Sequence, residues 1–299
     1  MTRTTAISLK RSCLLASCLF LVLFCTGCSL LRNRTAEEDT RLQAQHLANR
    51  GTELMQRGQL QEAGELFAEA TRLVPDHERG HAEYARVLWK QGRQEDAIIH
   101  MKRAARLSAN DPAYLIEIGQ MELERGHLEQ ALENAEAAVR ADARSFEAFA
   151  LRGKIRDRQG NPDRALADYL QVLGLQPEYA EVQLATARIY LQRRRGQRAL
   201  AILSRMPDMQ FPGNEQLRTV ARLKSRALKL LGRHDDAVQL LLHAVRNGPA
   251  DADLYFELAE AQWLSGQPEN AQLALRQALT INPEHPASRK LKASMAVGP

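Results

Sequence analysis

Cysteine is missing from most of this chain. The four cysteines among its 299 residues, Cys13, Cys18, Cys25 and Cys28, all lie within the first 28 positions. No disulfide can therefore form within the rest of the chain, which excludes a fold held together by disulfides.

Aromatic residues and strand patterns are also sparse. Aromatic residues make up 5% of the chain, and no window shows the sustained alternation of β-branched residues that is typical of a strand. Alanine, leucine, arginine, glutamate and glutamine are abundant instead, and all of them favour helices. The composition predicts an all-α protein.

The chain has only a small excess of positive charge. Its formal net charge is +5, but Arg3, Lys10 and Arg11 all belong to the N-terminal segment. The residues from Cys28 onward include 38 basic and 36 acidic side chains. A chain so close to neutrality gives no reason to expect nucleic-acid binding.

Long apolar runs are confined to the N-terminus. The basic segment 1–11 is followed by the uncharged run SCLLASCLFLVLFCTG, residues 12–27. This order is typical of a secretory signal peptide. The uncharged run continues to Leu31, and its 20 residues from Ser12 are also long enough to span a bilayer as an uncleaved anchor.

The end of this run resembles the bacterial lipobox. Thr26-Gly27-Cys28 carries the resemblance, which implies that the preceding residues are removed and that Cys28 is lipidated, although Cys25 stands where the family pattern favours leucine. Residue 29 is Ser, which by the same resemblance implies sorting to an outer membrane.

The remainder of the chain repeats with a nearly constant period. Seven alanines mark it, at spacings of 34, 34, 34, 34, 38 and 34: Ala63, Ala97, Ala131, Ala165, Ala199, Ala237 and Ala271. A glycine stands five residues before most of them: Gly58, Gly92, Gly126, Gly160, Gly232 and Gly266. Small residues let two helices approach closely, and the glycine suits the turn between them. Each unit is therefore a helical hairpin that buries its apolar face by stacking on its neighbours.

This pattern resembles the tetratricopeptide repeat. Seven repeats are predicted: 44–77, 78–111, 112–145, 146–179, 180–213, 218–251 and 252–285. The resemblance implies an all-α, right-handed superhelical solenoid, and residues 286–297 are expected to add a capping helix. The expected organisation is a signal peptide (1–27), a lipidated tether (28–43), repeats 1–5 (44–213), and repeats 6–7 with the capping helix (214–299).

A discontinuity is expected after repeat 5. The segment RMPDMQFPGNEQ, residues 205–216, contains Pro207, Pro212 and Gly213, and the period slips there from 34 to 38. Because proline cannot continue a helix interior, the second helix of repeat 5 is expected to stop early.

One short motif points to a different chemistry. His77-Glu78-Arg79-Gly80-His81 reads H-E-x-x-H, which on a continuous helix can hold zinc beside a glutamate base, as in a zinc-dependent hydrolase. Here the motif straddles the joint between repeats 1 and 2, two residues after Pro75. We expect His77 to lie outside the helix, with Asp76 or His77 near an N-cap, and we predict no metal site.

Candidate binding residues follow from the resemblance, because the first helix of each repeat lines the concave groove in this family. The candidates are Arg86, Trp89, Lys90, Lys154, Arg158, Arg188, Arg222, Arg226 and Lys229. Repeat 3 contributes Glu117 and Glu124 to the same surface, and repeat 7 contributes Glu257, Glu260 and Trp263. The middle of the groove is therefore expected to be basic and to bind a partner segment of acidic character.

The sequence contains no nucleophile constellation and no Gly-rich phosphate loop that we can name, so we expect a non-enzymatic binding protein without a cofactor. The leading hypothesis is a lipid-anchored envelope scaffold or assembly factor on the periplasmic face of an outer membrane, binding other envelope proteins. An alternative is an adaptor for an acidic envelope polymer or lipid head groups, using the basic groove or the turn that carries Arg193, Arg194, Arg195 and Arg198. An inner-membrane location through an uncleaved N-terminal helix also remains open.

Overall fold

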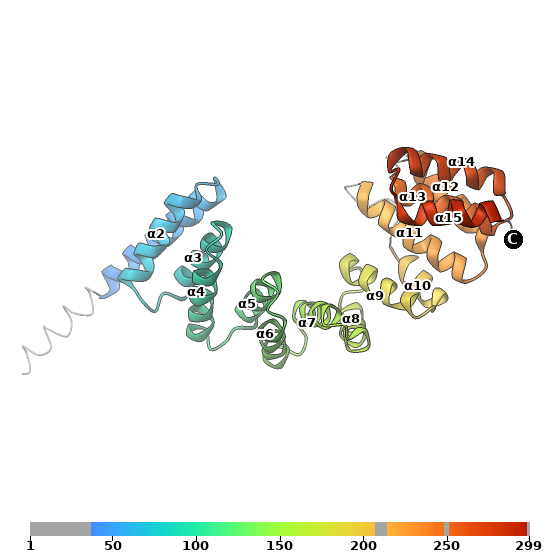
Figure 1. Cartoon of the computed structure of the whole chain (residues 1–299). Helices are drawn as coiled ribbons and strands as arrows, with labels where there is room; N and C mark the ends of the chain where they lie inside the picture. The colour runs from blue at the N-terminus through green and yellow to red at the C-terminus, as the bar shows by residue number, and fades with distance from the viewer. Residues whose placement is uncertain (1–36, 207–213, 248–250, 298–299) are drawn as a thin grey trace, which may run out of the picture. The chain divides into compact units, whose positions relative to one another are not determined.

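The structure, a computed structural model, describes residues 37–206, 214–247 and 251–297 (Figure 1). The regular elements in these ranges are all α-helices, so the predicted all-α fold of stacked hairpins is confirmed. Contacts between residues divide the chain into two compact units, Met1–His127 and Leu128–Pro299.

Each unit is a row of helices in sequence order. The first unit contains a helix over residues 37–56, α2 (Leu60–Leu73), α3 (Glu78–Lys90), α4 (Gln94–Leu107) and α5 (Pro112–Glu124). The second contains α6 (Leu128–Ala141), α7 (Phe146–Arg158), α8 (Pro162–Leu175), α9 (Ala180–Gln192), α10 (Gly196–Leu203), α11 (Asn214–Leu230), α12 (His234–Asn247), α13 (Ala252–Leu264), α14 (Pro268–Ile281) and α15 (Pro286–Val297). Consecutive helices within a unit pack against each other.

Glycine shapes both the turns and the helix contacts of the hairpins. The six turn glycines expected from the period all have positive φ, for example 80° at Gly58, a conformation that costs glycine little. Inside the hairpin of repeat 4, a Cβ atom on Gly153 would lie 2.6 Å from the ring of Tyr169. The small residue is therefore required for the close approach of α7 and α8.

The joints between repeats share one capping position. His77, Asp111, Ser145 and Asp251 each precede a first helix, and each side chain accepts a hydrogen bond from a backbone N–H in the first turn of that helix. These N–H groups have no partner within the helix, so such a cap stabilises it by about 1 kcal/mol.

The boundary between the two compact units falls just before α6. The buried residues of α6 are Ala131, Ala135 and Ala138, whereas α4 buries Ile98 and Met101 beside its alanines.

The slip in the period after repeat 5 changes two helices. α10 has 8 residues where the other second helices have 14, which confirms that this helix stops early. α11 has 17 residues where the first helices of repeats 2–5 and 7 have 13, so the four additional residues form about one more turn at its start, ahead of residue 218. Residues 207–213 lie outside the described ranges.

The ends of the array differ in how well they were predicted. Residues 37–43, which we assigned to the tether, are already helical, because the first helix of repeat 1 extends back to at least residue 37. At the other end, α15 confirms the predicted capping helix, and Arg289, Lys290 and Lys292 are exposed on it as expected.

Candidate functional site

Ion pairs connect the first helices of neighbouring repeats. Arg86 Nη2 lies 2.5 Å from Glu117 Oε1 in the next repeat, and Arg226 Nε lies 2.5 Å from Glu257 Oε1 in the same relation. In both pairs the acid is 31 residues after the arginine, one helical turn short of a full repeat. The hydrogen bond to Glu117 raises the pKa of Arg86, so this guanidinium stays charged.

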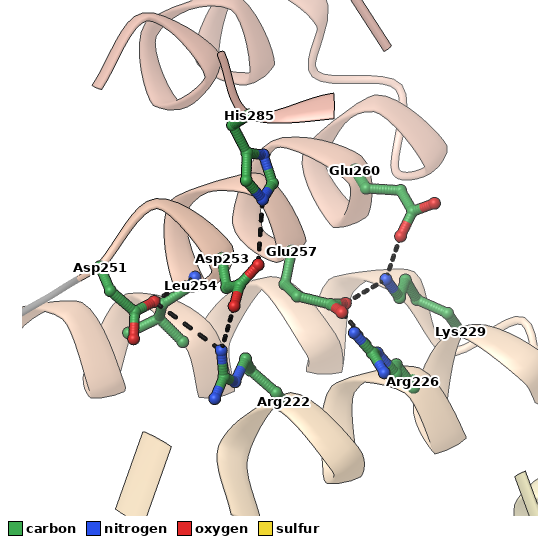
Figure 2. A network of polar contacts seen from close by, with 9 residues as sticks. All are labelled: Arg222, Arg226, Lys229, Asp251, Asp253, Leu254, Glu257, Glu260 and His285. Atoms are coloured by element: carbon green, nitrogen blue, oxygen red, sulfur yellow. Dashed lines mark hydrogen bonds and ion pairs between the residues drawn. The ribbon is translucent and has the colours of Figure 1, made fainter. Parts of the chain in front are cut away.

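The pairing is densest between α11 and α13 (Figure 2). Glu257 is 1% exposed, and its carboxylate accepts hydrogen bonds from both Arg226 and Lys229, the latter at 2.6 Å. Lys229 also donates to Glu260. A buried carboxylate with two cationic donors is well satisfied, so this cluster fixes α13 on α11.

A second branch of the same network reaches α15. Arg222 Nη1 lies 2.8 Å from Asp253 Oδ2, and Asp253 Oδ1 accepts a hydrogen bond from His285 Nε2 at 3.0 Å (Figure 2). The bond from His285, with help from Arg222, lowers the pKa of Asp253. The acidic residues of repeat 7 thus neutralise the cations of repeat 6.

Most of the predicted groove cations therefore have internal partners. Besides the pairs above, Lys154 Nζ lies 2.8 Å from Glu181 Oε1. Lys90 and Arg158 are exposed at the ends of their helices, and Trp89 is half-buried against the core cluster around Met101. The cations lie on first helices as expected, but the surface carries less net positive charge than the count of lysine and arginine suggests.

Arg188 differs from Arg86 and Arg226, which hold the same repeat position. It occupies in α9 the position that Arg226 occupies in α11, but the place of the acidic partner is taken by Leu223, which aligns with Glu257. Arg188 is exposed and makes no hydrogen bond or ion pair with any residue that the structure describes.

A groove of about 810 Å³ opens beside Arg188, on α9, α11 and α13. Its apolar lining consists of Leu191, Leu223, Leu230, Phe256 and Leu264, and its charged lining of Arg188, Arg194, Arg226, Lys229, Glu257 and Glu260. Leu230 and Leu264 are 38% and 47% exposed, although both are large apolar side chains. We call this surface the α9–α11–α13 groove.

The two exposed leucines share one repeat position, the last residue of the first helix. The same position holds Lys90, Glu124, Arg158 and Gln192 in repeats 2–5. The surface therefore changes from polar to apolar at repeats 6 and 7. Comparing this position across the repeats would have located these exposed leucines from the sequence, a signal that the list of charged residues did not contain.

The arginine-rich turn of repeat 5 is partly tied to the fold. Arg193 Nη2 lies 2.6 Å from Asp163 Oδ1, and the Arg198 guanidinium stacks 5.9 Å from the centre of the Tyr190 ring. Arg194 is exposed, lines the groove and has φ of 55°. It stands where six other repeats have the positive-φ glycine.

The H-E-x-x-H motif does not lie on one continuous helix. His77 precedes α3 and caps it, with Nδ1 accepting from Gly80 N at 2.9 Å, as the repeat register predicted. His81 Nε2 lies 2.9 Å from the Pro75 carbonyl oxygen, and its Nδ1 lies 2.9 Å from His100 Nδ1. Within the described ranges, no group of three or more His, Cys, Asp or Glu side chains is placed to hold a metal ion.

Family models place the chain among known proteins. Two models described as tetratricopeptide repeat match it, one over residues 49–112 and the other over residues 158–223 and 228–295. The chain belongs to the tetratricopeptide repeat family. This family consists of scaffolds that bind other proteins and are typically non-enzymatic, so the chain is a protein-interaction scaffold.

Individual relatives of this tetratricopeptide repeat protein share its fold. The match to the structure of a tetratricopeptide repeat protein from Parabacteroides merdae ATCC 43184 covers 84% of this chain and 97% of that one. Its TM-score is 0.57, at 17% sequence identity. The match to the structure of pilF from Pseudomonas aeruginosa covers 76% of this chain and 99% of that one. Its TM-score is 0.60, at 18% sequence identity.

A curated relative matches a shorter stretch of the tetratricopeptide repeat protein. U-box domain-containing protein 70 of Oryza sativa subsp. japonica is 27% identical over 125 residues, 42% of this chain. The match spans 16% of that relative's length.

The predictions for the N-terminus concern residues that the structure does not describe. Cys28 and the expected signal peptide lie outside the described ranges. Among the helices that the structure describes, none combines the length and apolar character needed to cross a membrane.

Proposed function

We propose that this tetratricopeptide repeat protein is a lipid-anchored scaffold of a bacterial envelope that binds a segment of another envelope protein in the α9–α11–α13 groove. The observation that carries the binding part is the groove itself, where Leu230 and Leu264 are exposed beside Arg188, which makes no hydrogen bond or ion pair with any residue in the described ranges. Exposed apolar side chains rimmed by charge are typical of protein-interaction sites.

The anchoring part rests on the N-terminal sequence. Lipidation at Cys28 and removal of residues 1–27 would place the array at a membrane surface, since several acyl chains together give stable anchoring. Ser29 supports the periplasmic face of an outer membrane. The overall similarity to pilF of Pseudomonas aeruginosa concerns the fold and leaves the partner open.

Photo-crosslinking in the native envelope tests the binding part. A photo-reactive amino acid at Leu264 is expected to capture a specific protein band. The same amino acid at Leu273, an exposed leucine on α14 outside the groove, serves as the matched control. Equal capture at both positions, or capture at Leu273 alone, would place the interaction outside the groove.

Intact-mass analysis tests the anchoring part independently. The membrane-extracted protein is expected to lack residues 1–27 and to carry acyl mass, and Cys28→Ser is expected to block this processing. Retention of Met1 in the parent protein would instead support an uncleaved inner-membrane anchor.

A further inference from the structure

The strongest unexplained feature of the α9–α11–α13 groove is its interrupted ion-pair row. Arg86 and Arg226 each face an acid 31 residues later, whereas the side chain aligned with those acids opposite Arg188 is Leu223. Arg188 is left exposed beside the apolar lining of the groove. A carboxylate from outside the chain can therefore pair with exposed Arg188 as Glu257 pairs with Arg226.

Arg194 adds a second cation at a conformational cost. Its φ of 55° is the left-handed conformation, and six other repeats use glycine at the same position. Non-glycine residues held in this region tend to gather at ligand sites. Arg194 therefore places a side chain where the other repeats have none, and this side chain lines the groove.

The turn that carries Arg194 is held firmly against α11. A Cβ on Gly196 would lie 2.9 Å from the Ala227 carbonyl oxygen and 3.0 Å from Leu230 Cβ, so the backbone of α10 meets α11 closely. Arg194 is thus presented beside exposed Leu230 from a fixed position. A backbone that is already fixed reduces the entropy lost when a ligand binds.

We propose that Arg188 and Arg194 bind the carboxylates of an acidic partner segment whose apolar side chain packs on Leu230 and Leu264. This proposal rests on the function proposed above and names the chemistry of the partner. Charge-assisted hydrogen bonds from guanidinium groups suit carboxylates, and the leucines require an apolar neighbour for burial.

A peptide suits this groove better than a lipid surface or an acidic polymer. On the opposite side of the groove Glu257 and Glu260 pair with Arg226 and Lys229, so that side is close to neutral and does not attract a surface of uniform negative charge. An extended peptide can direct its acidic side chains toward the arginines and an apolar side chain toward the leucines, since successive side chains point in opposite directions.

The test uses the full-length chain in detergent micelles and a displayed library of random peptides of about twelve residues, which span about 40 Å when extended. Selected peptides are expected to be enriched in Asp or Glu next to Leu, Ile or Phe. Their affinity, measured by fluorescence anisotropy, is expected to fall about tenfold or more in Arg188→Gln and in Arg194→Gly.

A matched control separates this site from general loss of charge. Arg233→Gln removes one cation from the corresponding turn of repeat 6, where Arg233 pairs with Asp236 and does not line the groove. It is expected to leave affinity unchanged. The melting temperature of Arg194→Gly is expected to equal or exceed that of the parent, since glycine relieves the positive φ, so lost binding cannot reflect unfolding.

The opposing outcomes are distinct. Acidic peptides that bind both groove variants as tightly as the parent would overturn this site while leaving the scaffold function standing. Arginine-dependent binding to phosphatidylglycerol vesicles, without selection of acidic peptides, would overturn the peptide assignment in favour of a lipid surface. Failure to select any peptide, together with no capture by photo-crosslinking at Leu264, would overturn both proposals.

Discussion

The Nδ1 atoms of His81 and His100 lie 2.9 Å apart, so the two imidazoles share one hydrogen. The Pro75 carbonyl oxygen can only accept, so His81 Nε2 carries a hydrogen, and the Nδ1 of neutral His81 then accepts from His100. His77, at the same joint, is also an acceptor at Nδ1. The hydrogen bonds at this joint between repeats 1 and 2 therefore require His77 and His81 to be neutral.

We predict that acid destabilises the first unit. Burial is the main cause that lowers the pKa of His77, His81 and His100 below the ordinary value of 6.5. Below pH 6.5 the unfolded chain therefore binds more protons than the folded chain. Stability is fully present above about pH 6.5 and falls as the pH drops toward the lowered values.

The two tryptophans allow a direct measurement of this effect. Trp263→Phe leaves Trp89 as a fluorescence reporter in the first unit, and Trp89→Phe leaves Trp263 in the second. Urea midpoints reported by Trp89 are expected to fall between pH 7.5 and pH 5.5, and His100→Gln should reduce the drop. A Trp89 midpoint independent of pH would contradict the prediction.

His77 is predicted to act as a helix cap and to bind no zinc. His77→Ala is expected to lower the free energy of unfolding by about 1 kcal/mol, while His77→Asn, which can accept the same hydrogen bond from Gly80, should cost much less. Metal analysis of protein purified without chelators should find less than about a tenth of an equivalent of zinc, as expected when no preformed site exists. One equivalent that disappears in His77→Asn would show that the motif does bind metal.

Two glycines on facing helices of repeat 4 are predicted to respond in opposite ways. Gly153→Ala places a Cβ 2.6 Å from the Tyr169 ring and is expected to destabilise the protein by about 1–3 kcal/mol through overpacking. Gly174→Ala, in α8, meets nothing within 4 Å and should stabilise by up to about 1 kcal/mol through helix propensity. Thermal melts of both variants provide the check, and a stable Gly153→Ala would show that the hairpin can open without cost.

The regular spacing of small residues explains why much of the fold could be predicted from the sequence. Helices α3, α5 and α7 begin at Glu78, Pro112 and Phe146, the predicted first residues of their repeats. Close helix contacts and positive-φ turns admit few residue types, so such positions leave a clear sequence pattern. The early end of α10 followed from Pro207 for a similar reason.

The groove was harder to predict because it depends on pairs of residues in different repeats. Arg188 and Arg226 look equivalent in the sequence, and only the side chain opposite each, Leu223 or Glu257, distinguishes them. The offset of 31 residues between paired charges follows from how neighbouring first helices are staggered, which the 34-residue period does not reveal. Charge alone therefore identified cations on the first helices but did not distinguish Arg188 from the cations that have acidic partners.

The final prediction concerns the buried carboxylate of the Arg226–Glu257–Lys229 cluster. Glu257→Gln removes a charge that is 1% exposed and leaves two cationic donors facing a neutral group. Breaking a fully buried pair typically costs about 3–5 kcal/mol. Here Lys229 keeps Glu260 and the side chain of Arg226 is 54% exposed, so we expect a smaller cost of about 1–3 kcal/mol.

The matched control for this prediction is Glu260→Gln, which removes the 38% exposed partner of the same lysine. It is expected to cost less than about 1 kcal/mol, since exposed ion pairs contribute little, and its small effect should shrink further in high salt. The effect of Glu257→Gln should persist in salt, because buried pairs are poorly screened. Urea unfolding reported by Trp263 at low and high ionic strength measures both. Equal costs for the two variants, abolished alike by salt, would mean that the cluster is a solvated surface pair and does not fix α13 on α11.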